Sequence, residues 1–149
     1  RAGKSRGLVL WALQRAYENA IPGRVLAGML VEPNTKLLDD VLVRDLEDVC
    51  HELGIRRTHW KQKGRWRLHF GDGLDFDLYL RSADKPEALV GVTVCFAAVD
   101  EAGVTRNASE VFRRVMPRVS EPEAKRPQFL ATDLLHPVRR TRGGGERPL

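Results

Sequence analysis

Between Arg56 and His69 the chain reads RRTHWKQKGRWRLH, a stretch that combines cationic and aromatic side chains and contains no acid. Lysine and arginine neutralise phosphates, and flat aromatic rings stack on unpaired bases. These residue types predict a nucleic-acid-binding surface. Its candidate contact residues are Arg56, Arg57, His59, Trp60, Lys61, Lys63, Arg65 and Arg67.

RNA is the favoured nucleic acid, and DNA is less favoured. Stacking by Trp60 requires unstacked bases, and no basic helix is present that would fit a DNA major groove. The C-terminal run RRTRGGGERPL resembles the Arg/Gly-rich segments that accompany RNA-binding domains, so Arg139, Arg140 and Arg142 would extend the footprint. A disordered, solubilising end is an equally good interpretation of this run. The basic and aromatic stretch 56–69 still leads us to expect a component of a ribonucleoprotein.

The net charge of +5 is distributed unevenly along the chain. Residues 54–70 hold six basic residues and no acid, whereas residues 36–53 hold six acids and two basic residues. A helix with six carboxylates would be repelled by phosphates, which argues against its use as a DNA recognition helix. The acidic helix 36–53 and the segment 120–149 instead support an alternative function, a protein-interaction subunit or adaptor of a larger complex.

Asp75 and Asp77 are spaced as two carboxylates on one face of a strand, as in some metal-binding pairs. A metal-dependent phosphotransfer enzyme is therefore a third hypothesis. We favour a structural explanation, because the hairpin described below gives each acid a cationic partner.

Gly3-Lys4-Ser5 precedes a helix and resembles the end of a phosphate-binding P-loop. The glycine and strand that should precede it are not in the chain, no acidic partner of the Walker B type is identified, and Ser5 is explained as a helix cap. Cys50, His51 and His59 lack the spacing of zinc ligands. We therefore predict a non-catalytic protein with no cofactor and no metal site.

Hydrophobic periodicity predicts the helices that support these residues. One helix runs from Lys4 or Ser5 to about Ala20, and a clearer one covers 36–53, with Asn34 or Thr35 as its N-cap and Gly54 after its end. The run Arg24–Glu32 is compatible with a strand or a helical turn. A capping box at 107–110 predicts a helix ending near Met116.

The segments 65–70 and 74–80 alternate with period two around Gly71-Asp72-Gly73 and predict a hairpin. One register pairs Leu68 with Phe76 and Trp66 with Leu78 on one face. On the other face, the same register pairs His69 with Asp75 and Arg67 with Asp77. A slip of one residue would destroy both sets of pairs.

The expected fold class is α+β, with an antiparallel sheet formed by the hairpin and a central strand 90–99 and covered by two or three helices. Residues 1–119 would form one domain and 120–149 an extended arm rich in Pro, Arg and Gly. Because the chain begins with Arg1, we expect a processed or truncated product. No apolar run is long enough to cross a membrane, and two cysteines form no disulfide framework, so we expect an intracellular protein.

Overall fold

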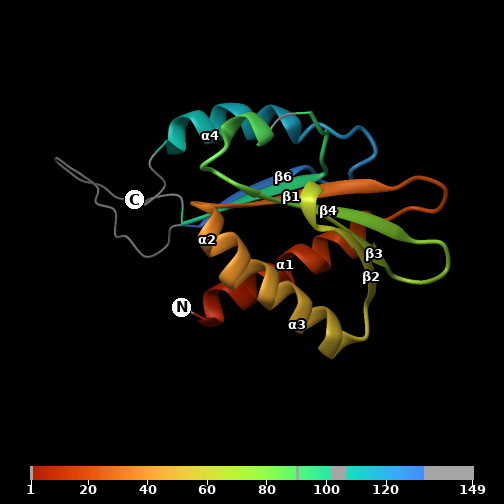
Figure 1. Ribbon diagram of the computed structural model, residues 1–149. Helices are drawn as coiled ribbons and strands as arrows, with labels where there is room; N and C mark the ends of the chain where they lie inside the picture. Colours follow the sequence, from red (N-terminus) through yellow and green to blue (C-terminus); the bar gives the residue numbers. More distant parts are fainter. Residues whose placement is uncertain (1, 90, 102–106, 133–149) are drawn as a thin grey trace.

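The computed structural model describes residues 2–89, 91–101 and 107–132. Six strands form one sheet in the order β2-β3-β4-β1-β5-β6, with α4 on one face and α1, α2 and α3 on the other (Figure 1). The strands are β1 (Leu26–Glu32), β2 (Arg56–Trp60), β3 (Arg65–His69), β4 (Asp75–Ser82), β5 (Phe96–Asp100) and β6 (Gln128–Thr132). The helices are α1 (Ala2–Asn19), α2 (Thr35–Leu37), α3 (Val43–Leu53) and α4 (Ala108–Val115).

The α+β class is confirmed, but the sheet is only partly antiparallel. Antiparallel pairing is confined to β2, β3 and β4, whereas β1 pairs in parallel with β4 and β5, and β5 with β6. Strands buried on both faces have near-continuous apolar sequences whatever their direction, so the sequence did not reveal this pairing. The run left open between strand and helical turn is the strand β1.

The hairpin has the predicted register. Leu68 faces Phe76, Trp66 faces Leu78, and the charged pairs are Arg67 with Asp77 and His69 with Asp75. The amide of Phe70 donates to the carbonyl of Leu74 at 2.8 Å and closes the ladder. Here the alternation of side chains was sufficient to determine the pairing.

The two N-terminal helices also agree with the prediction. α2 and α3 form one continuous helical segment with a π-helical turn at Leu38–Leu42 between them. The Asn34 side chain caps it by accepting from the Leu37 amide at 2.9 Å, and Gly54 follows α3 with φ 69°. No helix in the described part of the chain is long and apolar enough to cross a membrane.

The later elements differ from the prediction in detail. The strand expected at 90–99 begins at Phe96 and continues to Asp100. Asn107 lies at the N-cap of α4 but its side chain makes no capping hydrogen bond; its amide nitrogen donates to the Ala83 carbonyl at 3.4 Å. Within the segment predicted as an extended arm, β6 pairs with β5; residues 133–149 lie outside the described part.

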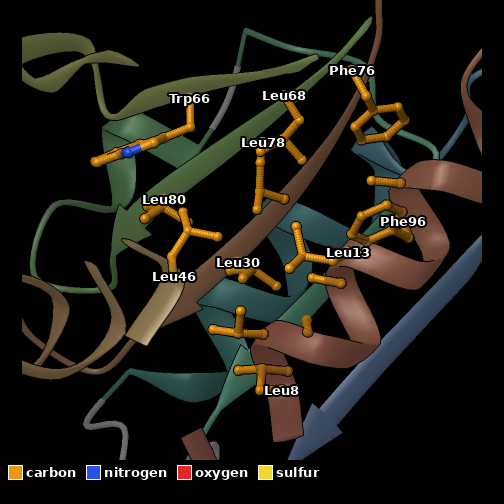
Figure 2. Packing of buried hydrophobic residues seen from close by; sticks show 14 of the residues in the cluster. Leu8, Leu13, Leu30, Leu46, Trp66, Leu68, Phe76, Leu78, Leu80 and Phe96 are labelled. Atoms are coloured by element: carbon orange, nitrogen blue, oxygen red, sulfur yellow. The ribbon is translucent and has the colours of Figure 1, made fainter. Parts of the chain in front are cut away.

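The larger hydrophobic core lies between the sheet and the helices α1 and α3 (Figure 2). Phe96 of β5 and Phe76 of β4 are fully buried and stack, with centroids 5.7 Å apart and planes 4° from parallel. Trp11 of α1 meets the Phe96 ring edge-on at 5.4 Å. These contacts join α1 to β5, the two elements that carry the candidate site.

Gly28 allows the Phe96 ring to lie against β1, so we expect Gly28→Ala to destabilise the protein. A Cβ at Gly28 would lie 2.3 Å from Phe96 Cζ, and the ring is enclosed by other aromatic side chains. Overpacking of this kind costs about 1–3 kcal/mol of unfolding free energy, measurable by urea denaturation. Gly7→Ala is the matched control, because a Cβ there meets nothing within 4 Å, and helical Ala is more stable than Gly. Equal stability of Gly28→Ala and the wild type would contradict the packing described here.

Candidate nucleotide-binding site

Polar residues from α1 and β5 meet at the carboxyl edge of the sheet, where the parallel strands β1, β4, β5 and β6 end. In open sheets with parallel strands, ligands bind outside this edge. The beginning of α1 contributes Lys4 and Ser5, and the end of β5 contributes Asp100 and the following Glu101. The two segments are almost a hundred residues apart in sequence.

Lys4 is the cation of this site. Its Nζ lies 3.8 Å from Asp100 Oδ1 and 4.0 Å from Glu101 Oε2. The side chains are largely buried, with 20% of Lys4, 6% of Asp100 and 12% of Glu101 exposed. At these distances the ammonium is attracted to both carboxylates but makes no hydrogen bond. The ammonium therefore has hydrogen-bonding capacity available for a ligand.

Ser5 is the second polar residue without a hydrogen-bond partner at the start of α1. It was predicted as the helix cap, but α1 begins at Ala2, so Ser5 lies within the first turns. Its hydroxyl is buried and unpartnered. Buried polar atoms without partners are uncommon in folded proteins, and a bound ion or ligand is one of the explanations for them.

Glu101 has an unusual backbone conformation for a residue that is not glycine, with φ 51°. This left-handed conformation costs on the order of 1–3 kcal/mol outside glycine, and such residues cluster at functional sites. It follows directly after Asp100, which is buried at the end of β5. The backbone strain therefore coincides with the acidic pair.

The four residues are of the types that bind a nucleoside triphosphate. A helix N-terminus presents free amides and a partial positive charge to phosphates, and Lys4 adds a full charge. Ser5 and Asp100 offer oxygen atoms to Mg²⁺. Among the described residues, no group of three or more His, Cys, Asp and Glu side chains could hold a metal by itself. Mg²⁺ is commonly held by one or two protein oxygens together with the substrate phosphates, so this donor set fits it.

In the predicted nucleic-acid stretch, the Trp60 ring contacts two cations of the same chain. The Arg65 guanidinium lies over the Trp60 ring at 4.2 Å, and that of Arg67 lies at 5.5 Å. The Trp60 ring thus makes cation–π contacts within the fold. Trp66 is buried in the core, as the hairpin register predicted.

Glu47 of the acidic helix binds the basic hairpin of the same chain. Its carboxylate accepts from Arg57 at 2.8 Å and from the Trp66 indole at 2.7 Å, and His59 Nδ1 lies 3.9 Å away. Burial tends to raise the pKa of Glu47, but the hydrogen bonds from Arg57 and Trp66 outweigh it and the net pKa is lowered. Arg57 is thus neutralised within the fold. Arg56, Lys61 and Lys63 are exposed.

Asp75 and Asp77 have the cationic partners that the hairpin register predicted. Arg67 donates twice to Asp77, at 2.7 and 3.0 Å, and His69 lies 3.1 Å from Asp75. These contacts occupy the carboxylates on which the phosphotransfer hypothesis depended. The remaining candidates, Arg139, Arg140 and Arg142, lie outside the described residues.

The fold resembles that of bacteriophage large terminases. No family model matches the chain, and no curated protein matches it. The Thermus phage P74-26 large terminase ATPase domain is 17% identical, with TM-score 0.63 over 89% of this chain and 55% of that one. A large terminase from a second, thermophilic bacteriophage is 17% identical, with TM-score 0.66 over 88% of this chain and 31% of that one. This second terminase has also been solved in complex with ADP and with ATP-gamma-S.

The chain thus spans about half of the P74-26 domain and about a third of the second terminase. At these identities the likeness concerns the fold, which is shared with an ATPase domain. It overturns the prediction of a non-catalytic RNA-binding or adaptor protein, and with it the expectations that the chain is no enzyme and that RNA is its main partner. The sequence-based prediction failed because it did not place Lys4 beside Asp100 and Glu101, which the fold brings together.

Sequence reasoning missed Asp100 and Glu101 because it ended the apolar strand at Val99. An apolar strand followed directly by Asp-Glu is the signal that was available, in the run FAAVDE. Its acids lie 3.8 and 4.0 Å from the Lys4 ammonium, where an acidic partner of Gly3-Lys4-Ser5 would be expected. The two segments are almost a hundred residues apart, and this spacing gives no indication that they meet.

Proposed function

We propose that this protein binds ATP with Mg²⁺ and hydrolyses it. The observation that carries the proposal is the position of Lys4 Nζ, 3.8 Å from Asp100 and 4.0 Å from Glu101. A lysine at a helix N-terminus opposite a buried acidic pair at the end of a parallel strand is the arrangement of P-loop nucleoside triphosphatases. The nucleotide complexes of the second terminase support the choice of ATP.

Each residue has a role in this proposal. Lys4 and the first amides of α1 bind the β- and γ-phosphates, where they also stabilise the charge that develops during transfer. Ser5 and Asp100 would hold Mg²⁺, which neutralises phosphate charge when it is bound. Glu101 orients a water molecule and takes its proton as the water oxygen attacks the γ-phosphorus. The bond from that phosphorus to the bridging oxygen breaks, and ADP and inorganic phosphate are the products.

Glu101→Gln tests this assignment of roles. Amide replaces carboxylate at nearly equal size, so the proton acceptor is removed while the phosphate contacts remain. We expect phosphate release to fall about 10²–10⁴-fold, because general base catalysis contributes that much. Affinity for ATP should stay within a few-fold of the wild type, since Glu101 is not assigned to nucleotide binding.

Lys36→Ala is the control for this measurement. Lys36 is 85% exposed, and its ion pair with Asp40 is on the helix surface. Its phosphate release should equal that of the wild type. Full activity of Glu101→Gln would contradict the proposed role of this residue, and absence of Mg²⁺-dependent phosphate release in the wild type would contradict the proposed function.

An intracellular location is part of the proposal, because ATP is supplied there. The two cysteines are consistent with a reducing compartment. Both are free and buried, and burial raises the pKa of Cys50 to about 11 and that of Cys95 to about 12. Thiols with such pKa values remain protonated and are poor nucleophiles at neutral pH.

A further inference from the structure

An apolar groove with a volume of about 440 Å³ lies beside α1. It is bounded by α1, the end of α3 and the hairpin of β3 and β4, on the sheet face that these helices cover (Figure 1). We define the apolar groove by six of the residues that line it, which are Leu10, Leu13, Tyr17, Leu53, Ile55 and Phe70. Gln14 is the only polar residue in its lining, and no charged residue lines it.

The apolar groove leaves large apolar side chains in contact with water. Tyr17 is 59% exposed, Leu53 57% and Leu10 42%. Leu10 and Tyr17 are separated by about two helical turns and therefore lie on the same side of α1. Single apolar side chains are ordinary on a protein surface, whereas a contiguous apolar patch beside a hollow indicates a binding site.

Two cations lie at one end of the apolar groove. Lys125 and Arg126 line a second hollow, of about 570 Å³, which shares Tyr17 with the groove. Both cations are exposed, and neither forms an ion pair with a described residue. Glu18 is the only acid that lines this hollow, and it accepts from Arg15 at 2.9 Å. This basic end therefore retains a positive potential that acidic side chains would neutralise.

Contacts within the fold fix both the groove and its basic end. The Tyr17 ring meets the Phe70 ring edge-on, with centroids 5.4 Å apart and planes at 84°. The Lys125 amide donates to Asn19 Oδ1 at 2.8 Å, which holds the basic end against the last residues of α1. A surface that is formed before binding loses less conformational entropy when a partner docks.

The backbone that borders the apolar groove is already hydrogen-bonded. The Ile55 amide donates to the Cys50 carbonyl at 2.9 Å. The Phe70 amide donates to the Leu74 carbonyl at 2.8 Å. An extended peptide that adds a strand depends on free backbone groups, whereas a helix satisfies its own backbone and binds through its side chains. The groove is therefore suited to a helix.

We infer that the apolar groove binds an amphipathic α-helix of another protein. The apolar side chains of that helix, at steps of three and four residues, would enter the groove between Tyr17 and Leu53. Acidic side chains at one end of the helix would lie over Lys125 and Arg126. A second copy of the chain that presented the same surface would bring only Glu18 to these cations, and Glu18 is already paired.

The apolar groove lies away from the candidate nucleotide site. Phe70 and Leu74 precede β4, and Gln128 begins β6, so the two hollows lie at the amino ends of these parallel strands. Lys4 and Asp100 lie at the opposite, carboxyl edge. The inference does not depend on ATP hydrolysis, and it does not involve the acidic side chains of helix 36–53, from which an adaptor function was expected.

The test is fluorescence anisotropy of a labelled helical peptide, held in helical form by a side-chain crosslink, with the full chain. The peptide is about 14 residues, or about four turns, long, with leucines at steps of three and four residues and glutamates in its first turn. The Tyr17→Ala/Leu53→Ala variant should bind at least about tenfold more weakly than the wild type, because a few anchor side chains carry most of the binding energy of such an interface. Absence of binding to the wild type, or equal binding to this variant, would overturn the inference.

Reversal of charge tests the orientation of the bound helix. Lys125→Glu/Arg126→Glu should weaken binding of the acidic peptide at least about tenfold. A second peptide, in which lysines replace the glutamates, should bind this variant more tightly than it binds the wild type. Lys61→Glu/Lys63→Glu makes the same change in net charge outside both hollows and should bind each peptide within about twofold of the wild type, because distant charges are screened. Equal effects of the two reversals would contradict the proposed orientation and overturn the inference.

Val25→Ala/Met116→Ala is the control for the loss of apolar surface. It removes two exposed apolar side chains outside the groove and should bind the acidic peptide like the wild type. Thermal melting must show that each variant is folded. A dimer of the chain in sedimentation experiments that Tyr17→Ala/Leu53→Ala abolishes would assign the groove to a second copy and overturn the inference. The same loss of binding to vesicles of phosphatidylcholine and phosphatidylserine would assign it to a lipid surface, with the same consequence.

The peptide and nucleotide experiments are independent of each other. Lys4→Ala should bind the acidic peptide like the wild type, and Tyr17→Ala/Leu53→Ala should retain wild-type ATP turnover. Failure of peptide binding with intact ATP turnover would refute the role of the groove alone. Peptide binding without Mg²⁺-dependent ATP turnover would refute the proposed ATPase activity alone.

Discussion

Replacing Lys4 by alanine is expected to abolish ATP turnover and to weaken ATP binding. Lys4 is the cation assigned to the phosphates, and the ammonium lies between Asp100 and Glu101 without a hydrogen bond of its own. Loss of one charge-assisted hydrogen bond costs about 1.5–3 kcal/mol, which corresponds to a loss in affinity of about ten- to a hundred-fold. Turnover should fall by at least about a hundred-fold more, because the lysine also stabilises charge in the transition state.

Isothermal titration with a slowly hydrolysed ATP analogue and an assay of phosphate release measure the two effects separately. Removing Lys4 leaves the acids at the end of β5 without their cation, so thermal melting must show that the variant is folded. Lys4→Arg is the second variant, since it keeps the charge but changes the geometry, and it should recover binding better than turnover. Wild-type affinity and turnover in folded Lys4→Ala would contradict the proposed site.

Phe96→Ala is expected to be the most destabilising of the substitutions considered. Phe96 is fully buried at the start of β5 and contacts the rings of Phe76 and Trp11. Truncation of a buried phenylalanine to alanine costs about 3–5 kcal/mol of unfolding free energy. Urea denaturation followed by circular dichroism measures it.

Two comparisons make this result specific. Phe96→Leu retains most of the apolar volume and should cost clearly less, whereas Met116→Ala, at a side chain that is 52% exposed, should change stability by less than about 0.5 kcal/mol. Since β5 carries Asp100 and α1 carries Lys4, ATP binding should also weaken in Phe96→Ala. A loss of less than about 1 kcal/mol would show that β5 and α1 are not joined through this ring.

Local features of the fold could be predicted wherever one register or one helical stripe satisfied every side chain. The hairpin is the clearest case, because both its apolar and its charged pairs agree with a single register. The helix ending before Gly54 is another, since its cap and its apolar stripe are local in sequence. The parallel pairing of β1 with β4 and β5 could not be predicted, because it depends on contacts between distant segments.

The candidate site shows the same limit. Gly3-Lys4-Ser5 resembles a phosphate-binding segment, but the sequence analysis rejected it because no acidic partner was identified; Asp100 and Glu101 lie almost a hundred residues away. Folding brings these two segments together through α1 packing on β5, which no spacing rule describes. In contrast, the stretch 56–69 is conspicuous in sequence, yet Glu47 and Asp77 neutralise Arg57 and Arg67 within the fold.

The most direct test of the central claim is a crystal structure of the protein with ADP or a slowly hydrolysed ATP analogue and Mg²⁺. We expect the phosphates at the N-terminus of α1, with Lys4 Nζ within hydrogen-bond distance of a phosphate oxygen. The Mg²⁺ should lie between the phosphates, Ser5 and Asp100. Nucleotide bound elsewhere, or no nucleotide at saturating concentration, would contradict the account.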